Sequence, residues 1–219
     1  MNAGDGEQRI YGVYSNAVKA AEDDTATLMY DYQGGVRVDV EDTQGILDLG
    51  GHTYTYSSSS NNAIIYSTKD NGSITIKNGT MITTNNKSDG IDMLGSNTSV
   101  RLEKVDMTVS GGTYGIVTNG NKSNNAITLK NSTLNVPDGY GIYFPSSGRV
   151  TIEDSVINAK YSGVQMCSGS LTCEGLTRPR SLPRVCLSRR RRMMESLRTV
   201  PRSPLIQTAA MPGGTSLPM

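Results

Sequence analysis

From Gly45 onward, apolar residues recur at fixed places in units of 21 to 27 residues. Each unit opens with a run in which apolar and polar residues alternate, which is the pattern of a strand with one buried face. The apolar positions of this run form two columns. The first holds Leu47, Ile74, Val100, Ile127, Val150 and Leu171, and the second holds Leu49, Ile76, Leu102, Leu129, Ile152 and Cys173. The sequence therefore predicts one equivalent strand in every unit.

Two further strands follow at the same intervals. The column of the second strand is Tyr54, Met81, Met107, Leu134 and Ile157. The third strand places Ile64, Ile91, Ile116, Ile142 and Val164 inward, and two residues later Tyr66, Met93, Thr118, Phe144 and Met166. Four residues of the third column follow a glycine, namely Gly90, Gly115, Gly141 or Gly163.

A single unit is too short to bury its own apolar residues, so the units must stack and share one interior. We therefore predict an all-β fold in which residues 44–175 form a parallel β-helix. Parallel crossovers strongly prefer the right-handed sense, which we expect here. On the outer face, charges alternate in sign at Lys77, Glu103, Lys130 and Glu153, so neighbouring coils should pair there.

Residues 1–43 are expected to form an N-terminal cap. Residues 13–22 place Val13, Ala17 and Ala20 on one helical face, which predicts a short helix covering the first coil. Strand-like runs follow at 25–32 and 36–40.

The repeat stops after about Cys173, and residues 176–219 differ in composition. This tail contains nine of the 21 basic residues, one of the 20 acidic residues and six of the eight prolines. It predicts a disordered or irregular basic segment outside the fold. We favour a shifted reading frame as its origin, because the codons for Met193, Met194 and Glu195 give Asp-Gly when read two bases later. The expected consequence is an uncapped last coil near Leu171 and Cys173, prone to end-to-end self-association.

Composition excludes several classes of protein. Without the tail, the chain has a net charge of −7, which argues against nucleic acid as a partner. No apolar stretch is long enough for a membrane span, and the chain shows no signal peptide. Three cysteines, an odd number without a paired framework, give no support for a disulfide scaffold.

The segment Gly45–Thr53, with the run Leu-Asp-Leu-Gly-Gly-His-Thr, resembles the opening coil of pectate-lyase-like β-helix proteins. The later segments GSITIKNGTM and AITLKNSTL are similar to coils of bacterial surface and adhesin-like members of that superfamily. The resemblance covers roughly residues 10–175. It implies a β-helix in an extracellular or cell-surface setting, and it does not specify an activity.

The catalytic candidates are Asp89 and Asp92. The run Ser88–Asp92 resembles a segment of polygalacturonases, which hydrolyse with paired carboxylates. That family also needs an acidic pair on the next coil, and the sequence here is Thr113–Val117, without an acid. A turn aspartate before a strand is the simpler interpretation.

No metal or cofactor is predicted. Asp106, Asp138 and Asp154 are scattered over coil turns, whereas calcium needs several oxygens at one point. Arg101 and Arg149 are expected to point outward. His52 has no second histidine or nearby cysteine to share a metal. Asn-x-Ser/Thr runs are interpreted as turn and ladder residues rather than glycan sites, and they occur at Asn71, Asn78, Asn86, Asn97, Asn121 and Asn131.

The ligand-binding candidates are Tyr114, Tyr140 and Tyr143, which could form a sugar-stacking strip or simply pack in turns. The leading hypothesis is a noncatalytic fragment of a secreted or cell-surface β-helix protein, adhesin-like and contacting a polysaccharide or host glycan. The alternatives are a truncated polysaccharide lyase or glycoside hydrolase whose catalytic coils are missing, and a purely structural stalk.

Overall fold

The computed structural model describes residues 25–40, 44–57, 63–84 and 87–175, and the backbone of 2–3 and 187–188. These residues form an all-β parallel solenoid of about five turns and contain no helix. The predicted fold class is therefore confirmed. The helix expected at 13–22 lies outside the described residues, as does the tail from 176 onward apart from that short strand.

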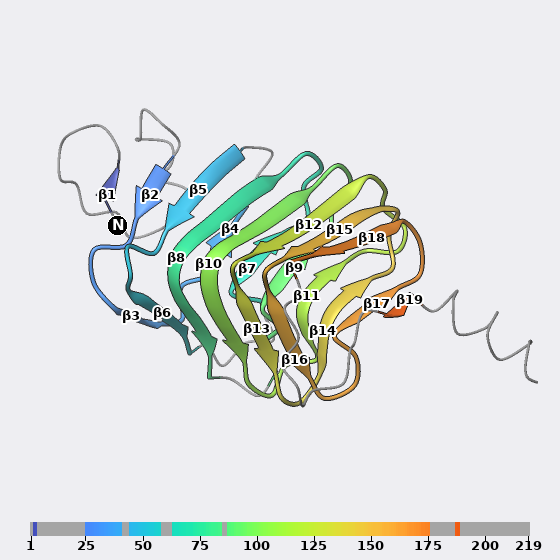
Figure 1. Ribbon diagram of the computed structural model, residues 1–219. Coiled ribbons are helices and arrows are strands. Elements are labelled where there is room, and N and C mark those ends of the chain that lie inside the picture. The colour runs from blue at the N-terminus through green and yellow to red at the C-terminus, as the bar shows by residue number, and fades with distance from the viewer. Residues whose placement is uncertain are drawn as a thin grey trace, which may run out of the picture.

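Two sheets make up the solenoid. The large sheet contains β1 (Asn2–Ala3), β2 (Thr25–Thr27), β3 (Tyr32–Gly34), β5 (Gln44–Asp48), β6 (Thr53–Tyr56), β8 (Ser73–Thr83), β10 (Ser99–Val109), β12 (Asn125–Lys130), β13 (Thr133–Val136), β15 (Gly148–Glu153), β16 (Val156–Ala159) and β18 (Ser170–Glu174). The small sheet contains β4 (Val38–Asp39), β7 (Ile65–Ser67), β9 (Ile91–Met93), β11 (Tyr114–Thr118), β14 (Tyr140–Phe144), β17 (Val164–Met166) and β19 (Leu187–Ser188). Figure 1 shows the coils stacked side by side, from β2 in blue to β18 in orange.

Four successive coils, from β8 to β16, bend once within the large sheet at a residue in the left-handed backbone region. These residues are Asn78, Lys104, Asn131 and Asp154, with φ angles of 59°, 54°, 47° and 43°. Asparagine tolerates this region better than most residues. β8 and β10 continue through the bend, whereas the next two coils divide there into β12 and β13, and into β15 and β16.

Most of the predicted interior columns are confirmed. The pairing register aligns Ile74, Val100, Ile127, Val150 and Leu171 on successive coils. The second-strand column from Tyr54 to Ile157 is also confirmed at every step. Nearly all of these side chains belong to one hydrophobic core, and Leu171, Cys173 and Ile157 pack partly buried against it. The expected self-association through this last coil stays a prediction.

The register predicted for the unit beginning at Gly45 is wrong in two strands. Leu47 lies beside Ile76 rather than Ile74, which is a shift of two residues that keeps Leu47 facing inward. In the third strand, Ile65 rather than Ile64 aligns with Ile91. Tyr66 therefore leaves the inward column, and Ser67 takes the inward place beside Met93. Ile64 is still fully buried.

A column of glycines lets the coils approach closely beside the small sheet. A Cβ atom on Gly90 would collide with the carbonyl oxygen of Gly115, and one on Gly115 would collide with that of Gly141. A Cβ atom on Gly141 would in turn meet the carbonyl oxygen of Gly163. Contact between coils therefore requires glycine at positions 90, 115 and 141.

The outer charge column is also in the predicted register. Lys77, Glu103, Lys130 and Glu153 lie on successive coils, and Asp48 precedes Lys77. Ion pairs join Lys77 to Asp48 at 3.5 Å and Lys130 to Glu153 at 3.6 Å. Glu103 instead contacts Arg101 on its own strand at 3.4 Å.

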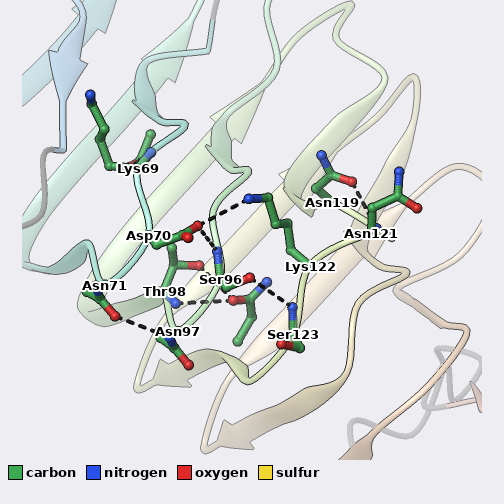
Figure 2. A network of polar contacts seen from close by, with 12 residues as sticks. Lys69, Asp70, Asn71, Ser96, Asn97, Thr98, Asn119, Asn121, Lys122 and Ser123 are labelled. Atoms are coloured by element: carbon green, nitrogen blue, oxygen red, sulfur yellow. Dashed lines mark hydrogen bonds and ion pairs between the residues drawn. The ribbon is translucent and has the colours of Figure 1, made fainter.

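Polar ladders hold the turns that connect the small sheet to the large sheet (Figure 2). The Asn97 amide donates to Asn71 Oδ1 at 3.2 Å, and the Asn124 amide donates to Asn97 Oδ1 at 3.0 Å. Asp70 accepts from the Ser96 N–H and from Lys122, two coils away. The interpretation of Asn71 and Asn97 as ladder residues is confirmed, whereas Asn86 lies outside the described residues.

Residues 25–40 continue both sheets rather than standing apart from them. β2, β3 and β4 pair in parallel with β5, β6 and β7. The solenoid therefore extends N-terminal of the boundary expected at residue 44. At the other end, Cys173 is disulfide-bonded, which the odd cysteine count did not indicate, and Cys167 is a free, exposed thiol.

Candidate functional site

The outer face of the small sheet brings together all five residues singled out in the sequence. Its central outward column is Asp39, Tyr66, Asp92, Val117, Tyr143 and Gln165, one residue from each successive coil. Tyr114 and Tyr140 pair with one another at the start of β11 and β14. Asp89 lies just before β9 and bonds to the start of β11. This face is the candidate site.

Four tyrosines form a continuous cluster on this face, which we call the tyrosine cluster: Tyr114, Tyr140, Tyr143 and Tyr161. The Tyr114 ring stacks on Tyr143 with centroids 5.1 Å apart and an interplanar angle of 16°. Tyr140 lies 5.8 Å from Tyr114 and 5.1 Å from Tyr161, in tilted pairs. The rings therefore cover part of each other's faces. Tyr161, which is 60% exposed, ends the row and presents the most open ring.

Asp89 accepts two backbone hydrogen bonds from the next coil. Its Oδ1 accepts hydrogen bonds from the backbone N–H groups of Thr113 and Tyr114, each at 2.8 Å. Burial raises the pKa of this carboxyl, and the two backbone hydrogen bonds oppose that shift. Asp89 thus ties its own coil to the next one.

Asp92 is the unusual acid of the face. Burial, followed by the nearby Asp89 charge, raises the pKa of Asp92 from 3.8 to about 7, and Arg37 opposes the shift. Its Oδ1 is buried and has no hydrogen-bond partner in the described structure. The residues aligned with Asp92 on the two neighbouring coils are Tyr66 and Val117. These surroundings therefore favour the protonated form of Asp92 over its carboxylate.

Arg37 extends the face toward the first described coil. Its Nε lies 2.7 Å from Asp39 Oδ1, and its guanidinium lies 4.4 Å above the centre of the Tyr66 ring. A cation over an aromatic face is held by the ring quadrupole as well as by the carboxylate. At the other end, the Lys160 ammonium lies 5.2 Å from the centre of the Tyr161 ring.

The remaining acids do not converge. Among the described residues, no group of three or more His, Cys, Asp or Glu side chains is placed to hold a metal ion. Asp138 accepts from the Gly111 N–H, and Asp154 occupies the left-handed bend. His52 Nδ1 lies 3.3 Å from Asp31 Oδ1, and its backbone N–H donates to Leu49.

No helix of the described chain has the length and apolar character of a membrane span.

Sequence reasoning missed Tyr66, Tyr161 and Arg37. Tyr66 had been placed in the interior, and the shift at Ile65 turns it outward. Tyr161 follows the polar Lys160 in a turn, so alternation of strand residues gives no direction for its ring. The available signal was its position 21 residues after Tyr140, within the range of the repeat.

Fold and site together define a parallel β-solenoid with an aromatic and acidic patch on the outer face of its smaller sheet. No protein-family model, no curated protein and no solved structure matches the chain.

Proposed function

We propose that this chain is a noncatalytic binding scaffold, and that the outer face of its small sheet contacts a carbohydrate polymer. The observation that carries the proposal is the tyrosine cluster, which ends in the exposed ring of Tyr161. Tyrosine offers a rigid apolar ring and a hydroxyl group at low entropic cost, which suits a sugar that has apolar faces and many hydroxyls. Tyr66, Asp92 and Gln165 add polar groups along the same column.

The row of rings runs across successive coils, so the contact would follow the long axis of the solenoid. Because stacking covers part of three rings, the ligand would meet the open Tyr161 ring and otherwise ring edges and hydroxyl groups. Such a surface favours many modest contacts with a repeating polymer over a deep pocket for one small molecule. This is the behaviour expected of an adhesin-like or glycan-contacting surface.

The resemblance of Gly45–Thr53 to the opening coil of pectate-lyase-like proteins supports placing the chain in that superfamily. It also supports a secreted or cell-surface location for the parent protein. Both assignments belong to this proposal, together with the noncatalytic role. A polar, repeat-built outer surface with a shared thin core is compatible with them.

The test is glycan-array binding, followed by titration with the strongest ligand. Tyr161→Ala and Tyr143→Ala should each weaken binding about tenfold, since each removes a ring from the contact. Thr151→Ala, an outward residue of β15 in the large sheet, is the matched control and should leave affinity unchanged. If all three variants bind equally well, the face is not the binding surface.

One observation favours a second candidate, an acid–base hydrolase or lyase. Asp89 and Asp92 are neighbouring acids, and the raised pKa of Asp92 lies in the range of a general acid. Two facts weigh against it: two backbone hydrogen bonds engage Asp89, and Val117 occupies the neighbouring coil position. A panel of polysaccharides should show no turnover; turnover that disappears in Asp92→Asn would overturn the noncatalytic proposal.

A further inference from the structure

A polar depression lies away from the tyrosine cluster, where the turns enter the large sheet. Its volume is about 460 Å³. One wall is an outward row on four successive coils, formed by Ser99, Ala126, Arg149 and Ser170. The other wall is formed by Asn97 and Asn124 of the turn ladder. We call this depression the edge notch, and Figure 2 shows the part of the ladder around Asn97 and Thr98.

Two small residues open the notch. Ala126 stands in the outward row between Ser99 and Arg149, where its methyl group leaves space between longer neighbours. Gly148 lies opposite Asn125, and a Cβ atom there would collide with the Asn125 backbone. The close approach of these two coils therefore requires glycine at position 148, so this position adds no side chain to the lining of the notch.

Most of the polar side chains in the lining are uncharged. Asn124 donates its side-chain amide to Asn97 Oδ1, and among the described residues none donates to Asn124 Oδ1. Asn125 also lines the notch and is almost fully buried, at 1% exposure. Its Oδ1 accepts from the Thr98 N–H and hydroxyl, each at 3.1 Å, while its Nδ2 has no partner in the described structure.

Arg149 supplies the charge. Arg37 and Arg101 each contact an acid, Asp39 and Glu103, whereas Arg149 is exposed and forms no ion pair with any described residue. Its row neighbours are Ala126 and Ser170, neither of which is acidic. A guanidinium without an acidic partner can donate two parallel N–H hydrogen bonds to one carboxylate or sulfate, and the neighbouring amides and hydroxyls can bond to the rest of the ligand.

We propose that the edge notch binds an anionic saccharide, whose carboxylate or sulfate pairs with Arg149 and whose ring hydroxyls bond to the Asn and Ser side chains. The volume is sufficient for one or two sugar rings, within the usual range of small-ligand sites. The notch lies on the large sheet, so this site is separate from the tyrosine cluster and does not depend on it.

The test is calorimetric titration of the whole chain at physiological salt with three probes: an alginate hexasaccharide, a dextran sulfate oligomer and neutral dextran. The wild-type chain should bind at least one anionic probe and not neutral dextran at the notch. Arg149→Gln should weaken that binding about tenfold, because it removes the only charge in the lining. Ala126→Leu should weaken it comparably by filling the notch without changing charge.

Arg101→Gln is the matched control, because it removes a positive charge from the same sheet outside the lining. Equal losses in Arg101→Gln and Arg149→Gln would indicate general charge attraction and overturn the site, as would the absence of anionic binding. Binding of only the uronate or only the sulfated probe, lost in Arg149→Gln, supports the site and identifies the anion. Thermal melts check that each variant is folded. Tyr161→Ala should leave anion binding at the notch intact, whether or not the small-sheet face binds a carbohydrate.

Discussion

Asp89 and Tyr114 join two coils of the solenoid, since the Asp89 carboxylate accepts the backbone N–H of Tyr114 at 2.8 Å. The same oxygen also accepts the Thr113 N–H. The bond lies beside the tyrosine cluster and fixes the start of β11, from which the Tyr114 ring projects. Stability and the geometry of the candidate site are therefore coupled at this residue.

Replacing Asp89 with alanine should lower the free energy of unfolding by about 1–2 kcal/mol, because two backbone donors lose their acceptor. Asp89→Asn keeps an acceptor oxygen and should cost less than half as much. Urea unfolding of the three proteins measures the difference. Equal losses for both variants would show that the charge of Asp89, rather than its hydrogen bonds, holds the coils together.

Asp92 should make the protein less stable as the pH rises toward 8. Its folded pKa of about 7 lies above the unfolded value of 3.8, so its protonated form stabilises the folded state. This contribution is complete below pH 3.8 and is lost as the pH passes through 7. Between pH 5 and pH 8 the expected loss is about 2–3 kcal/mol.

Asp92→Asn is the matched variant, because it cannot ionise and should remove that part of the pH dependence. Asp31 and Asp70 do not interfere, because their pKa values are lowered, mainly by backbone hydrogen bonds. Their contributions are present above the ordinary aspartate pKa and are lost only as the pH falls below it. Unfolding by urea at pH 5 and pH 8 provides the measurement; the same slope in both proteins would contradict a raised pKa at Asp92.

The glycine column predicts a sharp difference between two Gly→Ala substitutions. Gly115→Ala should destabilise the fold by about 2–4 kcal/mol, since its Cβ atom would collide with the backbone of Gly141. Gly120→Ala is the control, because its Cβ atom would meet only the Pro145 side chain, at 3.4 Å and beyond. Thermal unfolding should place Gly120→Ala near the wild type, and similar losses for both would refute the close-approach argument.

The repeat allowed the coil architecture to be predicted because the side-chain period and the coil length were both visible in the chain. From Ile74 onward the apolar residue of each strand could be recognised singly, so alignment by apolar residues found the register. The unit beginning at Gly45 differs because Ala63, Ile64 and Ile65 are all apolar, and a run of three cannot show which residue faces inward. Only contact with Ile91 decides that Ile65 does, and Tyr66 turns outward as a consequence.

The candidate site was found in part. Tyr114, Tyr140 and Tyr143 could be selected by their places in the repeat, but the mutual stacking of their rings depends on side-chain directions at the bend before β11 and β14. The raised pKa of Asp92 was likewise out of reach, since it arises from burial and from the Asp89 charge. The edge notch depends on Gly148 lying opposite Asn125, which requires the exact register of two coils.

Lys104 should be a position where substitution stabilises the protein. It adopts φ 54° at the bend where the adjacent coils have Asn78 and Asn131. Asparagine tolerates this backbone region better than lysine, so Lys104→Asn should raise the free energy of unfolding by about 0.5–1 kcal/mol. Lys104→Gln removes the same charge without the backbone preference and should bring no gain. Urea midpoints of the two variants decide the question, and an equal gain in both would assign the effect to charge rather than to backbone conformation.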